Sequence, residues 1–264
     1  MTPLELFGLI CLLGVARIAI SLRPVGVAAG GASVPVEADA QGTRLEGEAA
    51  QAQPPLSVVI KEYLDAFIVA GLVALFLITF VVRTFFIPSG SMEPTLQIHD
   101  VLLVNEFEYR LSKAHDEDIV VFTPAIPSTN DFIKRLIGSP GEKLRVHEGI
   151  VYRDDKPLDE PYIAQKPNYE MEIKNYGIYV DGIALDPAQA NIPPRDKWQA
   201  PDRIPEGCYF MMGDNRNNSD DSHIWGFAQS GGTFMAGPQK GQKAGFTGHA
   251  FLLFWPLDRI RILH

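Results

Sequence analysis

The apolar residues divide this chain into an N-terminal part with long apolar runs and a longer part with short ones. Residues 66–82 read AFIVAGLVALFLITFVV and contain no charge. A membrane-spanning helix needs about 17–25 mostly apolar residues, whereas a helix on a soluble core usually keeps a polar face. Tyr63, Phe85 and Phe86 flank the run, where aromatic rings suit the two interfaces. We predict a transmembrane helix over 66–82, with a buried core helix as the alternative.

A second apolar run, residues 4–22, opens the chain and includes Glu5 and Arg17. Glu5 would lie at headgroup level, and Arg17 would snorkel or face a partner helix. The run lacks the basic start of a cleaved signal peptide, which is the rival interpretation. We therefore predict a first transmembrane helix here.

Between these runs, residues 23–65 are rich in small and polar residues, which is typical of a flexible linker. This segment carries Arg23, Arg44 and Lys61, whereas Arg83 alone follows the second run closely. The positive-inside rule then predicts a cytoplasmic linker, with residues 83–264 across the membrane.

The remaining residues, 83–264, predict a mainly β domain. Short runs rich in β-branched residues alternate with clusters of Pro, Gly, Asn and Asp. The expected strands are 100–104, 118–122, 132–137, 149–152, 208–211 and 250–255. We expect residues 161–203 to be mostly loop, and residues 231–248 to form a Gly-rich insert.

Net charge and cysteine content exclude some classes of function for this protein. The 264 residues carry a net charge of −9, which argues against a nucleic-acid binder that relies on overall positive charge. Cys11 and Cys208 are the only cysteines, so a disulfide scaffold and a multi-cysteine metal site are excluded.

The first segment with candidate chemistry is IPSGSMEPTL, residues 87–96. Gly90 between Ser89 and Ser91 permits a backbone that presents a serine and its N–H groups to a ligand. A serine held in this way can act as a nucleophile beside an oxyanion hole. The alternative is an ordinary turn.

The second segment is DFIKRLIGSPGE, residues 131–142. On a strand, Lys134 would share a face with Phe132 and Leu136. An ammonium between apolar side chains is poorly hydrated, which lowers its pKa and lets the neutral amine act as a general base. The alternative is a lysine that snorkels from an edge strand.

The third segment is GDNRNNSDDSHIWG, residues 213–226. Its Asp and Asn side chains predict a tight loop built on local side-chain to backbone bonds. Arg216 and Ser219 break the pattern of an EF-hand calcium loop. Residues 217–219 also fit a glycosylation acceptor, which is a common match.

Together with PEGCYFMMGDN and the terminal WPLDRIR, these segments resemble the bacterial type I signal peptidases, the Ser-Lys S26 peptidases of protein export. The resemblance runs from about Ile60 to the C-terminus. It implies an antiparallel β-sheet catalytic domain of the signal-peptidase type, anchored by N-terminal transmembrane helices.

The resemblance also implies roles for individual residues. Ser91 matches the nucleophile and Lys134 the general base. Ser89 matches the residue whose hydroxyl helps to form the oxyanion hole. Ser219 matches the serine that orients the lysine, and Asp221 matches an acidic residue that supports the site structurally. Positions near the bound substrate match Ile87, Pro88 and Ile133.

Two positions depart from the family pattern. Asn217 stands where an aspartate is common. His223 stands where an arginine usually pairs with the aspartate at Asp221. A histidine at this place would make the pair weaker and sensitive to pH.

The implied activity is removal of signal peptides from exported preproteins after Ala-x-Ala, through an acyl-enzyme and without a metal or other cofactor. The implied place is the bacterial cytoplasmic membrane, with the catalytic domain outside the cytoplasm. Its partners would be preprotein signal peptides, the lipid bilayer and the export machinery, with no nucleic acid. The alternatives are a soluble Ser-Lys autoprotease, a membrane-anchored binding protein without catalysis, and a peptidase dedicated to few substrates such as pilins.

Overall fold

The computed structural model describes residues 12–14, 17, 56–80 and 82–263. Most of the predicted first span, residues 23–55 of the predicted linker and Cys11 lie outside the described residues. The chain divides into two compact units, Met1–Thr79 and Phe80–His264.

The first unit contains helix α2, Leu56–Phe80. The helix begins inside the predicted linker, so residues 56–65 are helical, and it ends before Val82, which opens a strand. Across the described residues, no helix is both long enough and apolar enough to cross a membrane.

An ion pair joins the earlier apolar segment to α2 within this unit. Arg17 Nε lies 2.6 Å from Asp65 Oδ1. Arg17 therefore faces a partner helix, one of the two arrangements expected for a cation in this segment.

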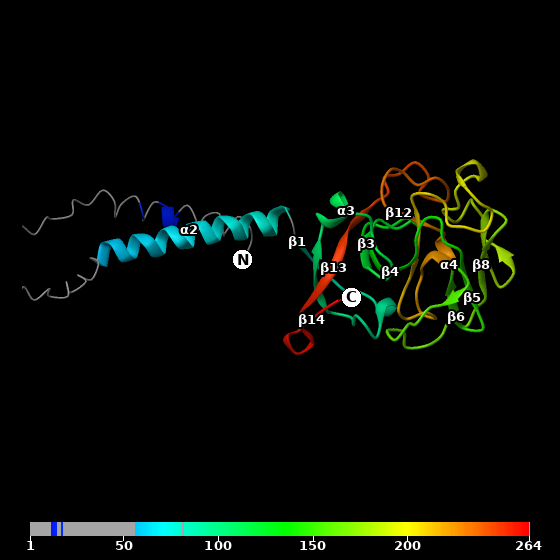
Figure 1. Cartoon of the computed structure of the whole chain (residues 1–264), viewed down its shortest axis with the longest axis horizontal. Coiled ribbons are helices and arrows are strands. Elements are labelled where there is room, and N and C mark those ends of the chain that lie inside the picture. The colour runs from blue at the N-terminus through cyan, green and yellow to red at the C-terminus, as the bar shows by residue number, and fades with distance from the viewer. Residues whose placement is uncertain (1–11, 15–16, 18–55, 81, 264) are drawn as a thin grey trace, which may run out of the picture. The chain divides into compact units, whose positions relative to one another are not determined.

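The second unit is built on two antiparallel sheets (Figure 1). The first sheet has eight strands in the order β1-β2-β13-β3-β4-β11-β12, with β14 paired to β13. Its strands are β1 Val82–Phe86, β2 Val101–Asn105, β3 Ile119–Phe122, β4 Phe132–Gly138, β11 Cys208–Met212, β12 Ala228–Gln229, β13 Phe246–Trp255 and β14 Arg261–Ile262.

The second sheet has six strands in the order β10-β9-β8-β5-β6-β7. Its strands are β5 Leu144–His147, β6 Ile150–Arg153, β7 Lys156–Pro157, β8 Met171–Lys174, β9 Gly177–Val180 and β10 Ile183–Ala184. Figure 1 places β5, β6 and β8 on the opposite side of this unit from β1, β2 and β13.

Short helices complete the unit. The α-helices are α3 Glu108–Leu111 and α4 Ser222–Trp225, and the 3-10 turns are η1 Gly90–Met92, η2 Arg195–Lys197 and η3 Leu257–Arg259. The prediction of a mainly β, antiparallel domain is confirmed, and each of the six expected strands overlaps an observed one.

The expectation that residues 161–203 are mostly loop is confirmed, although the short strands β8, β9 and β10 also lie within this range. Their hairpins turn on Asn175–Tyr176 and Asp181–Gly182, where both central residues have positive φ. Positive φ at both positions suits a two-residue hairpin. Such turns leave strands so short that the polar residues between them look like continuous loop.

The predicted Gly-rich insert, residues 231–248, is tied to the rest of the unit. Phe234 and Ala244 are each 2% exposed and pack in the core that includes Phe122 and Trp225. The last residues of the insert begin strand β13. The segment is therefore a core-anchored connection from β12 to β13.

Candidate active site

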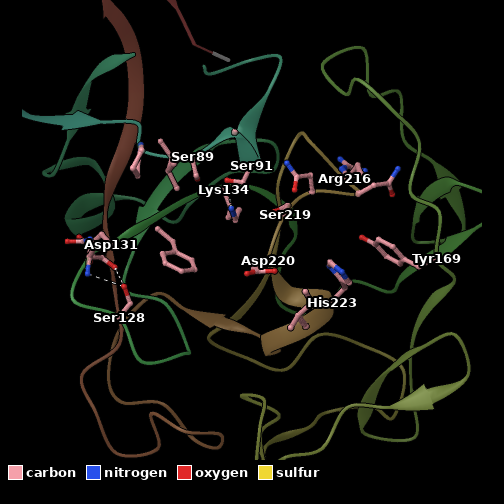
Figure 2. A pocket seen from close by; sticks show the side chains of 18 of the residues that line it. Ser89, Ser91, Ser128, Asp131, Lys134, Tyr169, Arg216, Ser219, Asp220 and His223 are labelled. Carbon is pink, nitrogen blue, oxygen red and sulfur yellow. Dashed lines mark hydrogen bonds between the residues drawn. The ribbon is translucent and has the colours of Figure 1, made fainter. Parts of the chain in front are cut away.

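The three segments singled out in the sequence meet at one cleft in the second unit, with a cavity of about 490 Å³. Figure 2 shows Ser91 and Lys134 between Ser128 and Asp131 on one side and Arg216 and Tyr169 on the other. The cleft thus has two arms that extend from a central Ser-Lys pair.

Ser91 lies in the short turn η1, after Ser89 in extended backbone. Two bonds from Asn215 hold this turn: its backbone N donates to Ser91 O at 3.1 Å, and its Nδ2 donates to Gly90 O at 3.0 Å. The Ser89 side chain does not cap the turn, and it is exposed at the cleft. Its hydroxyl is therefore placed to meet a ligand beside Ser91.

Gly213 allows the 213–226 loop to approach the Ser91 turn closely. A Cβ at this position would lie 2.4 Å from Ser91 O and 2.2 Å from Ser219 Oγ. Both separations are far below van der Waals contact, so any larger residue would push the two segments apart. The glycine therefore sets the spacing between Ser91 and Ser219.

Lys134 extends from strand β4 to Ser91, with its Nζ 2.6 Å from Ser91 Oγ. The residue is only 4% exposed. Burial lowers the pKa of Lys134 from its ordinary 10.5 to about 8, although Asp221, Asp220 and Asp214 act in the opposite direction. Loss of hydration outweighs these carboxylates, so the neutral amine is accessible near neutral pH.

A buried ion pair between Arg135 and Asp214 stabilises the site. Arg135, the next residue on β4, donates from Nε and Nη2 to the Asp214 carboxylate at 2.9 and 2.8 Å. Thr95 Oγ1 donates to the same carboxylate at 2.5 Å. Asp214 thereby links β4, the Ser91 segment and the 213–226 loop, a role that the sequence analysis did not assign.

Ser219 lies at the cleft, but no hydrogen bond joins it to Lys134. Its Oγ is buried and has no hydrogen-bond partner in the part of the chain that the structure describes. The expected orienting bond to the lysine is therefore not formed in this arrangement, although Ser219 lines the same cavity.

Asp221 is fully buried and organises the loop. Its carboxylate accepts from Gly213 N at 3.0 Å and lies 2.6 Å from His223 Nδ1. His223 thus takes the place beside Asp221 that the sequence suggested, and it also stacks on Tyr169 with 4.3 Å between ring centroids.

Of the three residues expected near the substrate, two line the cleft. Pro88 and Ile133 are part of its wall. Ile87 is not: it is 2% exposed and packs in the core with Met92 and Leu102. Ile87 therefore faces the core, whereas the next residue, Pro88, faces the cleft.

The structure adds cleft residues that the sequence analysis missed. Asn168 and Tyr169 come from the segment before β8, and Ser128 and Asn130 precede β4. Nothing local marks these residues, because only the packing of the second sheet brings Tyr169 to His223. Among the described residues, no group of three or more His, Cys, Asp or Glu could hold a metal ion.

Comparison with known proteins agrees with this site. The family model for signal peptidase, peptidase S26, matches residues 60–233. The chain is 38% identical over 201 residues to the probable signal peptidase I-2 of Synechocystis sp., covering 74% of this chain and 73% of the relative. It is 32% identical over 218 residues to the signal peptidase I of Leptolyngbya laminosa, covering 80% of this chain and 87% of that protein.

A further relative is the probable signal peptidase I-1 of Synechocystis sp., which is 37% identical over 207 residues, covering 76% of this chain and 85% of its own. The chain belongs to the signal peptidase family, peptidase S26. It is accordingly a signal peptidase enzyme, of the family that cleaves signal peptides from preproteins.

Proposed function

We propose that this chain is a membrane-bound serine endopeptidase that removes signal peptides through a Ser91 nucleophile and a Lys134 general base. The observation that carries the proposal is the 2.6 Å contact between Lys134 Nζ and Ser91 Oγ on a lysine that is 4% exposed. A nucleophile and a base within hydrogen-bond reach are what covalent catalysis requires.

In the proposed mechanism, neutral Lys134 takes the Ser91 hydroxyl proton as Oγ attacks the scissile carbonyl. The tetrahedral intermediate collapses, the C–N bond breaks, and the Lys134 ammonium returns the proton to the leaving amine. Water then attacks the acyl-enzyme with Lys134 again as base, which frees Ser91 and the signal peptide's carboxylate.

The developing oxyanion would be held by the Ser91 N–H and the Ser89 hydroxyl. Ser89 supports this role because it lies beside Ser91, lines the cleft and does not cap η1. One such donor is worth about 3 kcal/mol of transition-state stabilisation.

Strand β4 offers a place for an extended substrate. Its partner β11 pairs with Arg135, Leu136 and Gly138 but not with Phe132–Lys134, whose edge toward the cleft is free of any strand within residues 82–263. A peptide added there would form main-chain hydrogen bonds and present alternate side chains to Pro88 and Ile133. Close walls would favour small side chains, in keeping with Ala-x-Ala.

Exposed apolar residues support the membrane part of the proposal. In the second unit, the large apolar side chains between 46% and 68% exposed include Phe86, Ile98, Trp255, Leu257, Ile260 and Ile262. In α2 they include Phe67, Val69, Leu72, Val73 and Phe76, between 50% and 62% exposed. Exposed apolar surfaces of this kind mark contact with protein or lipid. We assign the apolar residues of the second unit to the outer side of the cytoplasmic membrane, and those of α2 to its interior.

The test is cleavage of a purified preprotein with an Ala-x-Ala site by the full chain in detergent. We expect cleavage after the second alanine, and its loss in both Lys134→Ala and Ser91→Ala. Cleavage that survives Ser91→Ala would refute the assigned nucleophile. An inactive wild type on several preproteins would favour the binding-protein alternative.

A further inference from the structure

The cleft continues past the Ser-Lys pair along a wall that no mechanistic step uses. We call this the polar wall: Asn168, Tyr169, Asn217, Asn218 and Asp220. Four of these residues are exposed, and Tyr169 is 9% exposed. The opposite arm, by contrast, includes Pro88, Phe132 and Ile133.

Asn217 fastens the two halves of the polar wall together. Its Oδ1 accepts from Asn168 N at 2.9 Å, and its Nδ2 donates to Lys166 O at 3.0 Å. Only a side chain with both an acceptor and a donor can make this pair of bonds. The asparagine at this position therefore holds the segment before β8 against the 213–226 loop.

Tyr169 is held in the polar wall by its ring rather than by its hydroxyl. The ring stacks on His223 with an interplanar angle of 10°. The hydroxyl is buried and has no hydrogen-bond partner in the described part of the chain. Figure 2 shows this end of the side chain directed toward the centre of the cleft.

The sheet determines how a peptide would reach this wall. A peptide beside Phe132–Lys134 reaches Ser91 at Lys134, and beyond that point β11 occupies the edge, beginning at the pair Met212 and Arg135. The peptide must therefore leave β4 at the scissile bond. The cleft continues there along Tyr169 and residues 216–220.

The two arms differ in chemistry as well as in position. Small apolar side chains before the scissile bond suit the arm with Pro88 and Ile133. The polar wall presents mainly amide and carboxylate groups, and it suits the polar, variable start of a released chain. The residues after the scissile bond would then lie on the polar wall.

Asp220 gives this wall a negative charge, which also acts on the nearby amine of Lys134. It is exposed and makes no ion pair within 4.0 Å among the described residues. Arg216 also lines the cleft, but it is 1% exposed and lies 2.6 Å from Glu160. His223 is likewise engaged with Asp221 at 2.6 Å.

We infer that the polar wall binds the first residues after the scissile bond, and that Asp220 makes this subsite select against acidic residues there. The inference rests on the proposed peptidase function. Asp220 is thus a specificity-determining residue on the leaving side of the substrate.

The test uses peptides with an Ala-x-Ala site and either Glu or Lys at the second position after the bond. The full chain should cleave the Lys peptide with a kcat/KM about two- to five-fold higher, the range of exposed charge interactions. Asp220→Asn should bring this ratio close to one. The matched control is Asp131→Asn, which removes an exposed aspartate from the opposite arm of the same cleft and should leave the ratio unchanged.

A second peptide pair places Glu or Lys four residues before the bond, where Asp131→Asn should alter the ratio and Asp220→Asn should not. The binding of both pairs to Ser91→Ala, measured by fluorescence anisotropy, should follow the same order. A leaving-side ratio that Asp220→Asn does not change, in cleavage and in binding, overturns the inference. Cleavage that persists in Ser91→Ala refutes the proposed mechanism instead, while the binding ratios still decide this inference.

Discussion

At the scale of single residues, the role that we propose for Lys134 depends on its burial, because loss of hydration lowers the pKa of its amine to about 8. The strand pattern alone left a snorkelling lysine as the alternative, and the resemblance to a peptidase family was needed to single out Lys134. The buried position of Ile87 in the core could not be predicted, because adjacency to Ser91 in the sequence does not reveal which side chain faces inward. Tyr169 was missed because its place depends on contacts with a distant loop.

The buried lysine predicts a pH profile. Protonated Lys134 cannot accept the Ser91 proton, so kcat/KM should rise with pH through an inflection near the lysine's pKa of about 8. At pH 6 it should fall about 100-fold below the plateau, two pH units below that pKa. A profile that is flat between pH 6 and 9 would contradict this role.

The same residue predicts a pH-dependent stability. An unfolded lysine keeps a pKa near 10.5, so the unfolded state binds more protons than the folded state between about pH 8 and 10.5. Stability should rise with pH across this window. At pH 7, Lys134→Met should raise the free energy of unfolding by up to about 3 kcal/mol, and the gain should shrink as pH rises above 8. Denaturant titrations at several pH values measure both effects, and a gain that is equal at pH 7 and pH 10 would contradict the explanation.

Gly213→Ala should disturb the site directly, because its Cβ would meet Ser91 O and Ser219 Oγ. We expect a destabilisation of about 1–3 kcal/mol, as for overpacked interiors, and a loss of kcat larger than any change in KM. Gly177→Ala is the control: its Cβ would meet Tyr179 at an ordinary 3.7 Å. Steady-state kinetics would measure kcat and KM of the two variants, and thermal unfolding would measure their stability. Equal values for both variants would mean that Gly213 does not set the spacing between Ser91 and Ser219.

At the scale of elements, strands were predictable where β-branched residues form a buried run, as in β3 with its four buried positions. The β8–β9 hairpin of the second sheet was missed because it turns on Asn175 and Tyr176, which carry no glycine signal. The catalytic loop was recognised from its Asp and Asn content. Its attachment to the second sheet through Asn217 was not, since that bond joins residues far apart in sequence.

That attachment can be tested with a pair of neighbouring substitutions. Asn217→Asp keeps the acceptor for Asn168 N but loses the donor to Lys166 O. We expect a loss of about 0.5–1.5 kcal/mol and faster hydrogen exchange at the Asn168 amide. Asn218→Asp makes the same chemical change at an adjacent exposed residue and should show neither effect. Similar exchange in both variants would mean that Asn217 does not hold the segment.

At the scale of the whole molecule, the mainly β domain and the family followed from the order of several short motifs, although no one of them is decisive. Among the described residues, no helix is long and apolar enough to cross a membrane, and the transmembrane helix expected over 66–82 stays a prediction. Membrane association is instead testable through tryptophan exposure. Trp255 is 50% exposed, whereas Trp198 and Trp225 are 7% and 1% exposed.

With the full chain in vesicles that contain brominated lipid, quenching of the fluorescence should come mainly from Trp255. Trp255→Phe should remove most of the quenchable signal, while the two buried tryptophans continue to emit. Quenching that is unchanged by the substitution would place the lipid contact elsewhere on the chain.

The partly unpaired strand β4 also bears on aggregation. An open sheet edge is a template on which other chains can build, and proteins usually shorten or charge such edges. Here the open stretch is confined to Phe132–Lys134, ended on one side by β11 and preceded on the other by Asp131. It is long enough to bind a short extended peptide and too short to nucleate a stack of strands. An enzyme that binds hydrophobic, unfolded chains can thus keep a short open strand edge without nucleating their aggregation.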